Sequence, residues 1–292
     1  MPDITLFKDL DSLSFYAAQL LYKRIKQRID TGREANIILA GGNTPKLCYA
    51  KLAKLINNFG MESDALKKLY WYPGDERWVP SAHPDSNEGM IREYLFGELN
   101  PVSAVPEENA VSINFFKWKT NTDTNSHKVT PLESADRYNT LLDNRFYKRG
   151  IRPDIVVLGM GSDGHTASLF PDGEFILSDS AEGLTQCPGN HPALKSLKKN
   201  RAFCCRVAPQ LNRNASAVYR QKLNIWRLSM TASFLNSAEL VVFLINGKDK
   251  HNAFIKLLNG TNSLPVSWIK GKETLYLITE SINPPPITRS SL

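Results

Sequence analysis

The stretch Pro153-Asp154-Ile155-Val156-Val157-Leu158 runs directly into Gly159-Met160-Gly161-Ser162-Asp163-Gly164-His165. A short apolar run followed by a glycine-rich polar turn is typical of a buried strand that ends at a functional edge of an α/β sheet. If the pattern recurs elsewhere in the chain, it indicates further strands of the same sheet.

The same pattern appears at two earlier places. Residues 36–40 are apolar and stop at Gly41-Gly42-Asn43-Thr44-Pro45, before a helix-like stretch over 46–55. Residues 68–72 form a third run, which is closed by 73–77. Later strands are predicted at 239–245 and 274–278.

This alternation predicts an α/β protein with an open, mostly parallel, Rossmann-like sheet that carries helices on both faces. Ligands of such sheets bind outside the carboxyl ends of the strands, so the three polar turns are expected to converge on one crevice. We expect a single domain over residues 1–282 and a frayed, proline-rich tail over 283–292. The irregular stretches 116–131 and 172–214 are expected to be surface insertions, and their role is open.

Composition narrows the class of partner. The chain has 292 residues, a formal net charge of +7 and 42% hydrophobic residues, which is the profile of a globular protein that favours anionic partners. The basic cluster 195–201 lacks the aromatic pattern of a nucleic-acid-binding motif, so we expect a small phosphorylated metabolite rather than nucleic acid. The chain shows no signal segment, membrane span or C-x-x-C pair, and we expect a cytoplasmic monomer.

The turn formed by Gly41, Gly42, Asn43 and Thr44 is a candidate phosphate cradle. Glycines let backbone amides approach an anion, and a helix N-terminus adds partial positive charge. An ordinary turn with Thr44 as the helix N-cap explains these four residues equally well.

Residues 159–164 match G-x-G-x-x-G, the pattern of a dinucleotide-binding loop. We discount a dinucleotide because the pattern lies mid-chain and Pro171 would cut the following helix short. The glycines are better explained as presenting His165, which is expected to open a short helix capped by Asp163. An imidazole at that position can take a proton from water near neutral pH.

Asp75 and Arg77 lie two residues apart after the third strand, so in an extended chain their side chains point the same way. Arg77 offers a planar fork for phosphate, and Asp75 could orient a hydroxyl group or assist proton transfer. The alternative is a plain surface ion pair. No H-E-x-x-H motif and no G-x-S-x-G elbow is present, so neither a metal nor a serine nucleophile is indicated.

Taken together, several segments resemble the 6-phosphogluconolactonase family. They are Leu39–Pro45, Gly74–Pro80, Asp85–Met90, Leu158–Pro171, Trp226–Thr231, Leu235–Ala238 and Asn246–Lys250. The resemblance implies hydrolysis of 6-phospho-D-glucono-1,5-lactone, the second step of the oxidative pentose phosphate pathway, without a cofactor. It also implies that the 41–44 turn and Arg77 line the sugar-phosphate site, that His165 is the base, and that Arg227 and Lys222 add positive charge.

Two alternatives stay open at this point. Glucosamine-6-phosphate isomerase/deaminase shares the expected fold, but its histidine segment reads D-G-H-I-A-F-N-E-P, and the glutamate is missing here. A non-catalytic sugar-phosphate sensor is expected to carry a DNA-binding segment or to lack the histidine. Which group protonates the leaving ring oxygen is not decided by the sequence.

Overall fold

The computed structural model describes residues 2–58, 63–100, 109–110, 130–172, 174–177, 201–204, 213–220 and 225–285. Its centre is a six-stranded sheet in the order β1-β11-β10-β5-β2-β3, in which every neighbouring pair is parallel. The strands are β1 (Asp3–Phe7), β2 (Ala35–Leu39), β3 (Leu69–Pro73), β5 (Ile155–Leu158), β10 (Leu240–Ile245) and β11 (Glu273–Thr279). The predicted parallel sheet is confirmed.

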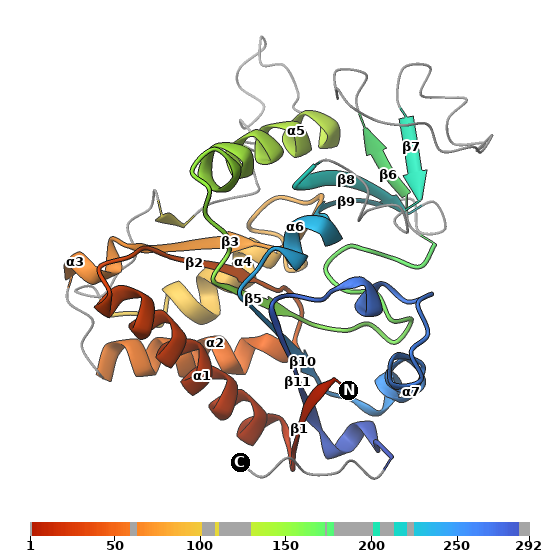
Figure 1. Ribbon diagram of the computed structural model, residues 1–292, viewed down its shortest axis with the longest axis horizontal. Coiled ribbons are helices and arrows are strands. Elements are labelled where there is room, and N and C mark those ends of the chain that lie inside the picture. Colours follow the sequence, from red (N-terminus) through yellow and green to blue (C-terminus); the bar gives the residue numbers. More distant parts are fainter. Residues whose placement is uncertain are drawn as a thin grey trace.

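Helices cover both faces of this sheet because alternate strand residues enter two different cores. Ile37 and Leu39 belong to one buried cluster, and Ile38 between them belongs to the other. Helices α1, α2 and α4 bury residues in the first cluster, while α5, α6 and α7 bury residues in the second (Figure 1). The helices are α1 (Leu10–Asp30), α2 (Thr44–Asn58), α3 (Ser63–Leu66), α4 (Asn87–Ile91), α5 (Pro131–Leu142), α6 (Ala232–Asn236) and α7 (His251–Leu258).

A second, antiparallel sheet was not predicted. Its order is β4-β9-β8-β6-β7, and Figure 1 shows β8 and β9 beneath α5 with β6 and β7 at the outer end. The strands are β4 (Asp75–Arg77), β6 (Glu174–Leu177), β7 (Arg201–Cys204), β8 (Ala215–Arg220) and β9 (Ile225–Met230). Its inner residues, including Ala217 and Leu228, belong to the second core cluster. The expectation of irregular structure across 172–214 is thus wrong for β6 and β7.

Residues 75–77 form the extended strand β4, which after Gly74 pairs with β9 rather than continuing β3. Two local expectations are corrected. No helix follows His165: Thr166 and Leu169 form a bridge across a tight turn, and Ala167 takes a positive φ of 47°. Helix α2 begins at Thr44 itself, so Thr44 is not the residue before the helix.

Some expectations lie outside the described residues. These are the position of Lys222, the tail beyond Pro285 and most of the two insertions. Among the described helices none is suited to crossing a membrane: α1 is 21 residues long, but it carries charged side chains along its length.

Candidate active site

Two arginines face each other where the second sheet begins. The antiparallel pairing of β4 with β9 makes Arg77 and Arg227 direct cross-strand neighbours. One Arg77 Nη1 donates to the backbone oxygen of Asp85 at 2.7 Å, and its Nε is buried without a partner. Burial, together with the charge of Arg77, lowers the pKa of Arg227.

Neither guanidinium forms an ion pair with a carboxylate in the described part of the chain. Two neighbouring positive charges that are partly removed from water repel each other unless an anion lies between them. Guanidinium forks bind phosphate in bidentate geometry. The pair is therefore a candidate anion site.

Asp75 is buried beside this pair and is held by two side chains. Its Oδ2 accepts a hydrogen bond from the Ser168 hydroxyl at 2.6 Å, and its Oδ1 accepts one from Asn87 Nδ2 at 3.1 Å. The same Asn87 amide donates to the backbone oxygen of Asp75 at 2.8 Å. Asp75 is 6% exposed, so the surface ion pair considered from the sequence is not formed.

The glycine turn reaches the same place through Asn87. A Cβ built on Gly41 would lie 1.8 Å from Asn87 Oδ1, so only glycine allows this close approach. Gly42 has a φ of +89°, which again favours glycine. Asn43 and Thr44 follow, and α2 begins at Thr44. The turn therefore combines a close backbone approach with a helix N-terminus.

His165 is oriented by Asp163. The two side chains meet at 2.5 Å between His165 Nδ1 and Asp163 Oδ1, and the same oxygen accepts the His165 backbone N–H at 3.1 Å. The prediction that Asp163 caps a helix is wrong, since its carboxylate binds the imidazole. A Cβ on Gly161 would lie 2.0 Å from His165 Nδ1, so this glycine lets the ring fold back over the turn.

Phe170 connects the histidine to the arginine pair. Its ring centroid lies 4.7 Å from that of His165, and the Arg227 guanidinium carbon lies 6.0 Å from the same ring. The turn between His165 and Phe170 also supplies Ser168 to Asp75. His165, Asp75, Arg77, Arg227 and the Gly41 turn therefore belong to one connected site.

The sequence reasoning assigned no role to Glu76, Asn87 or Ser168, although all three lie inside the segments that carried the resemblance. Glu76 points away from Asp75 along β4 and is fully buried. Burial raises the pKa of Glu76 to about 7, against hydrogen bonds from backbone N–H groups that lower it. The only sequence feature that could have pointed to Glu76 and Asn87 was the polar character of segments 75–77 and 85–89. Nothing in the local sequence indicates that these two segments are in contact.

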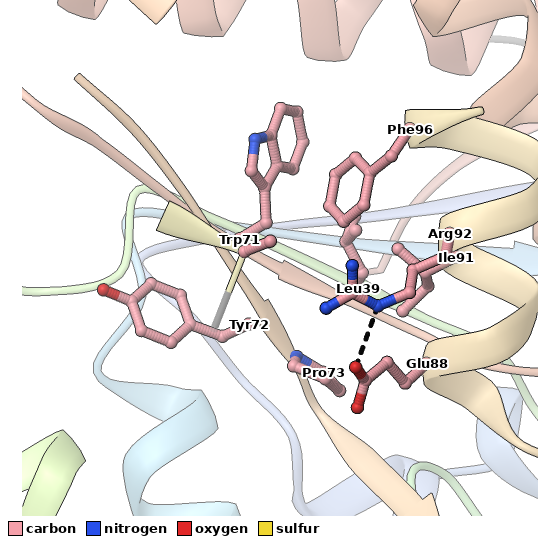
Figure 2. Close-up of a pocket in the computed structure, with 9 residues that line it drawn as sticks. Leu39, Trp71, Tyr72, Pro73, Glu88, Ile91, Arg92 and Phe96 are labelled. Atoms are coloured by element: carbon pink, nitrogen blue, oxygen red, sulfur yellow. Dashed lines mark hydrogen bonds and ion pairs between the residues drawn. The ribbon is translucent and has the colours of Figure 1, made fainter. Parts of the chain in front are cut away.

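An open hollow lies between β3 and the helical segment that begins at Asn87 (Figure 2). Trp71, Phe96 and Ile91 line it, with the Arg92–Glu88 ion pair at 2.9 Å along its rim. None of the candidate catalytic or anion-binding residues faces it. Neither Arg77 nor Arg227 lines the hollow, and the Glu88 backbone N–H links its rim to Glu76.

The chain is similar to known sugar-phosphate enzymes. The model of the family described as glucosamine-6-phosphate isomerases/6-phosphogluconolactonase matches residues 8–197 and 206–277. A 6-phosphogluconolactonase of Synechocystis sp. is 29% identical over 233 residues, which are 79% of this chain and 74% of that protein.

Among solved structures, the 6-phosphogluconolactonase of Thermotoga maritima aligns with a TM-score of 0.68 at 21% identity. The alignment covers 96% of this chain and all of that one. A monomeric glucosamine-6-phosphate deaminase aligns with a TM-score of 0.64 at 19% identity, over 96% of this chain and 98% of that one. At these identities the likeness establishes the α/β fold, and it does not choose between the two activities.

Proposed function

This chain belongs to the glucosamine-6-phosphate isomerase/6-phosphogluconolactonase family, and from that premise we propose that it hydrolyses 6-phospho-D-glucono-1,5-lactone to 6-phospho-D-gluconate. The observation that carries the proposal is the placement of the Asp163–His165 pair near two arginines that form no ion pair with an acidic side chain among the residues that the structure describes. A base for water and a site for phosphate are the two things this reaction requires.

In the proposed mechanism, His165 removes a proton from the water that attacks the lactone carbonyl. Asp163 occupies Nδ1, so Nε2 is the nitrogen left to accept the proton. The neighbouring carboxylate keeps the imidazole in one tautomer and stabilises the imidazolium that forms. His165 then returns the proton to the ring oxygen as the lactone opens.

Asp75 is assigned to positioning in this scheme. Both of its carboxylate oxygens accept hydrogen bonds, from Ser168 and from Asn87, and these contacts fix the orientation of the side chain. A carboxylate at the start of β4 can accept hydrogen bonds from sugar hydroxyl groups. This assignment favours His165 over Asp75 as the acid for the leaving oxygen.

Phosphate is assigned to Arg77, Arg227 and the backbone of the turn at Gly41, Gly42, Asn43 and Thr44. Lys222 is assigned to the same site on the family pattern alone. Binding the phosphate fixes the distant carbonyl next to the base, so remote binding energy assists the reaction itself. Lactone without the phosphate is expected to react more slowly as well as to bind more weakly.

The chain offers a specific reason against the deaminase activity. Phe170 stands where the deaminase segment has its glutamate, and its ring packs on His165, so an apolar ring occupies that position. We place the enzyme in the cytoplasm as a monomer that needs no cofactor, in keeping with the sequence expectations.

The test follows the loss of freshly prepared lactone, corrected for spontaneous hydrolysis, with wild type, His165→Ala and Asp163→Asn. We expect His165→Ala to lower kcat by about 10²- to 10⁴-fold. Asp163→Asn, which misorients the ring, should lower kcat by roughly 10²-fold. His251→Ala is the matched control, because that imidazole donates from Nδ1 to the backbone oxygen of Ile282 at 2.9 Å and has no part in the proposed reaction.

The control is expected to keep wild-type kcat. Wild-type protein that does not accelerate lactone hydrolysis would contradict the proposed function, and ammonia release from glucosamine-6-phosphate would then identify the deaminase.

A further inference from the structure

The buried carboxylate of Glu76 links strand β4 to the turn at residues 85–88. Its Oε1 accepts from the backbone N–H of Arg77 at 2.6 Å and of Asn87 at 2.8 Å. Its Oε2 accepts from the Ser86 hydroxyl at 3.0 Å and from the Glu88 N–H at 2.8 Å. We propose that Glu76 is a positioning residue that closes the 85–88 turn and thereby sets the geometry of the anion site.

The 85–88 turn contacts three separate parts of the site. The backbone oxygen of Asp85 accepts from Arg77 Nη1, which orients one guanidinium. The Asn87 amide holds Asp75 at both its backbone and its carboxylate. The same amide group packs so closely against Gly41 that a Cβ atom there would overlap it. Displacing this turn would therefore disturb Arg77, Asp75 and the glycine turn together.

The arrangement requires a carboxylate rather than an amide. Each oxygen of Glu76 faces two donors, and at least one of the two on either side is a backbone N–H that cannot turn away. A glutamine would place its NH₂ group against such a donor in either orientation. Glu76→Gln should consequently release part of the turn while keeping the size of the side chain.

Holding a charge here opposes folding rather than assisting it. Burial raises the pKa of Glu76, which means that the ionised form is the disfavoured one. Charged groups also surround it on β4, β9 and the turn: Asp75, Arg77, Asp85, Glu88 and Arg227. An uncharged side chain at this position would serve stability better than a carboxylate. We therefore attribute the carboxylate of Glu76 to its role in ordering the 85–88 turn.

This inference rests on the proposed function for its phosphate site, but its test does not depend on lactone turnover. The probe is sulfate, which stays a dianion between pH 6 and 9 and needs only the anion site. We expect Glu76→Gln to weaken sulfate binding about tenfold at pH 8, as for the loss of one hydrogen bond to a charged group. The midpoint of thermal unfolding at pH 8 should not fall below that of wild type.

Asp154→Asn is the matched control, because Asp154 is also buried and also accepts a backbone N–H, from Asn36 at 2.8 Å, at the opposite edge of the sheet. It is expected to keep wild-type sulfate affinity. Folded Glu76→Gln with wild-type affinity overturns the proposal, and so does an equal loss in Asp154→Asn. Should Glu76→Gln fail to fold, Ser86→Ala removes one donor and is expected to weaken sulfate about threefold; unchanged affinity there overturns the proposal.

Lactone kinetics on the same proteins separate the two proposals. If wild type turns over the lactone, KM in Glu76→Gln should rise by about the same tenfold as the sulfate dissociation constant. If wild type does not turn over the lactone, the proposed function fails, and the sulfate comparison still decides the role of Glu76.

Discussion

Arginine side chains have different surroundings at the two ends of the parallel strands. Where strands β2 and β5 begin, two guanidinium groups have acidic partners: Arg28 pairs with Asp154 at 2.6 Å, and Arg145 pairs with Glu34 at 2.9 Å. Where β2 and β3 end, Arg77 and Arg227 lie beside each other with no such partner in the described chain. Charges satisfied within the protein support the fold, whereas charges left to repel each other indicate a ligand.

The first edge is closed by its own residues. Arg145 donates to Asn36 Oδ1 at 3.2 Å and to the Tyr72 hydroxyl at 3.0 Å, and its guanidinium lies 3.6 Å from the centre of the Tyr70 ring. Groups that are engaged with one another in this way are less available to a substrate. The same residue type thus serves packing at one edge and recognition at the other.

Replacing one arginine at each edge should give the largest effects, on stability at one edge and on KM at the other. Arg145→Met removes one of the two guanidinium partners of Glu34 and the hydrogen bonds to Asn36, and it is expected to cost ~3 kcal/mol of unfolding free energy with little change in KM. Arg227→Met removes a repulsion and a phosphate ligand, so KM should rise about 10²-fold while stability is kept. Urea unfolding and steady-state kinetics of both variants provide the check; a large loss of stability in Arg227→Met would contradict it.

The buried carboxylate at the substrate edge should also appear in the pH dependence of stability. The pKa of Glu76 is about 7 in the folded protein and 4.5 in the reference state, so folding binds a proton between these values. This contribution is fully present below pH 4.5 and is lost as pH rises through 7, a change of ~3 kcal/mol.

Urea unfolding of wild type and Glu76→Gln at several pH values measures this term. The variant is expected to lack the decline between pH 4.5 and 7 that Glu76 causes. Parallel curves for the two proteins would show that Glu76 does not titrate in this range.

The smallest effect compares two glycines with positive φ. Gly42, at the substrate edge, has φ +89°, and Gly150, before β5 at the other edge, has φ +61°; both have open space where a Cβ would be. Alanine at either position should cost about 1 kcal/mol through backbone strain alone. Only Gly42→Ala is expected to raise KM, because only that turn is assigned to phosphate, and equal KM values in both variants would argue against the assignment.

The predicted parallel strands were found because their signal is local. Residues 36–40, 68–72, 239–245 and 274–278 are each apolar runs bounded by turn residues, and burial on two faces requires that composition. The second sheet had no such signal, since β8 and β9 mix polar and apolar residues and gain their order from each other. The predicted helix after His165 was wrong because a tight turn with Ala167 at positive φ uses the same few residues.

Composition and local pattern by themselves determined the α/β class, and they identified His165, Asp75, Arg77 and the Gly41 turn as candidate site residues. Only the tertiary structure decided that Arg227 stands opposite Arg77, that Asp163 binds His165, and that Glu76 holds the 85–88 turn. The physical reason is range. Strand and turn preferences act between neighbours in sequence, whereas hydrogen bonds and charge interactions depend on distances that the folded chain alone establishes.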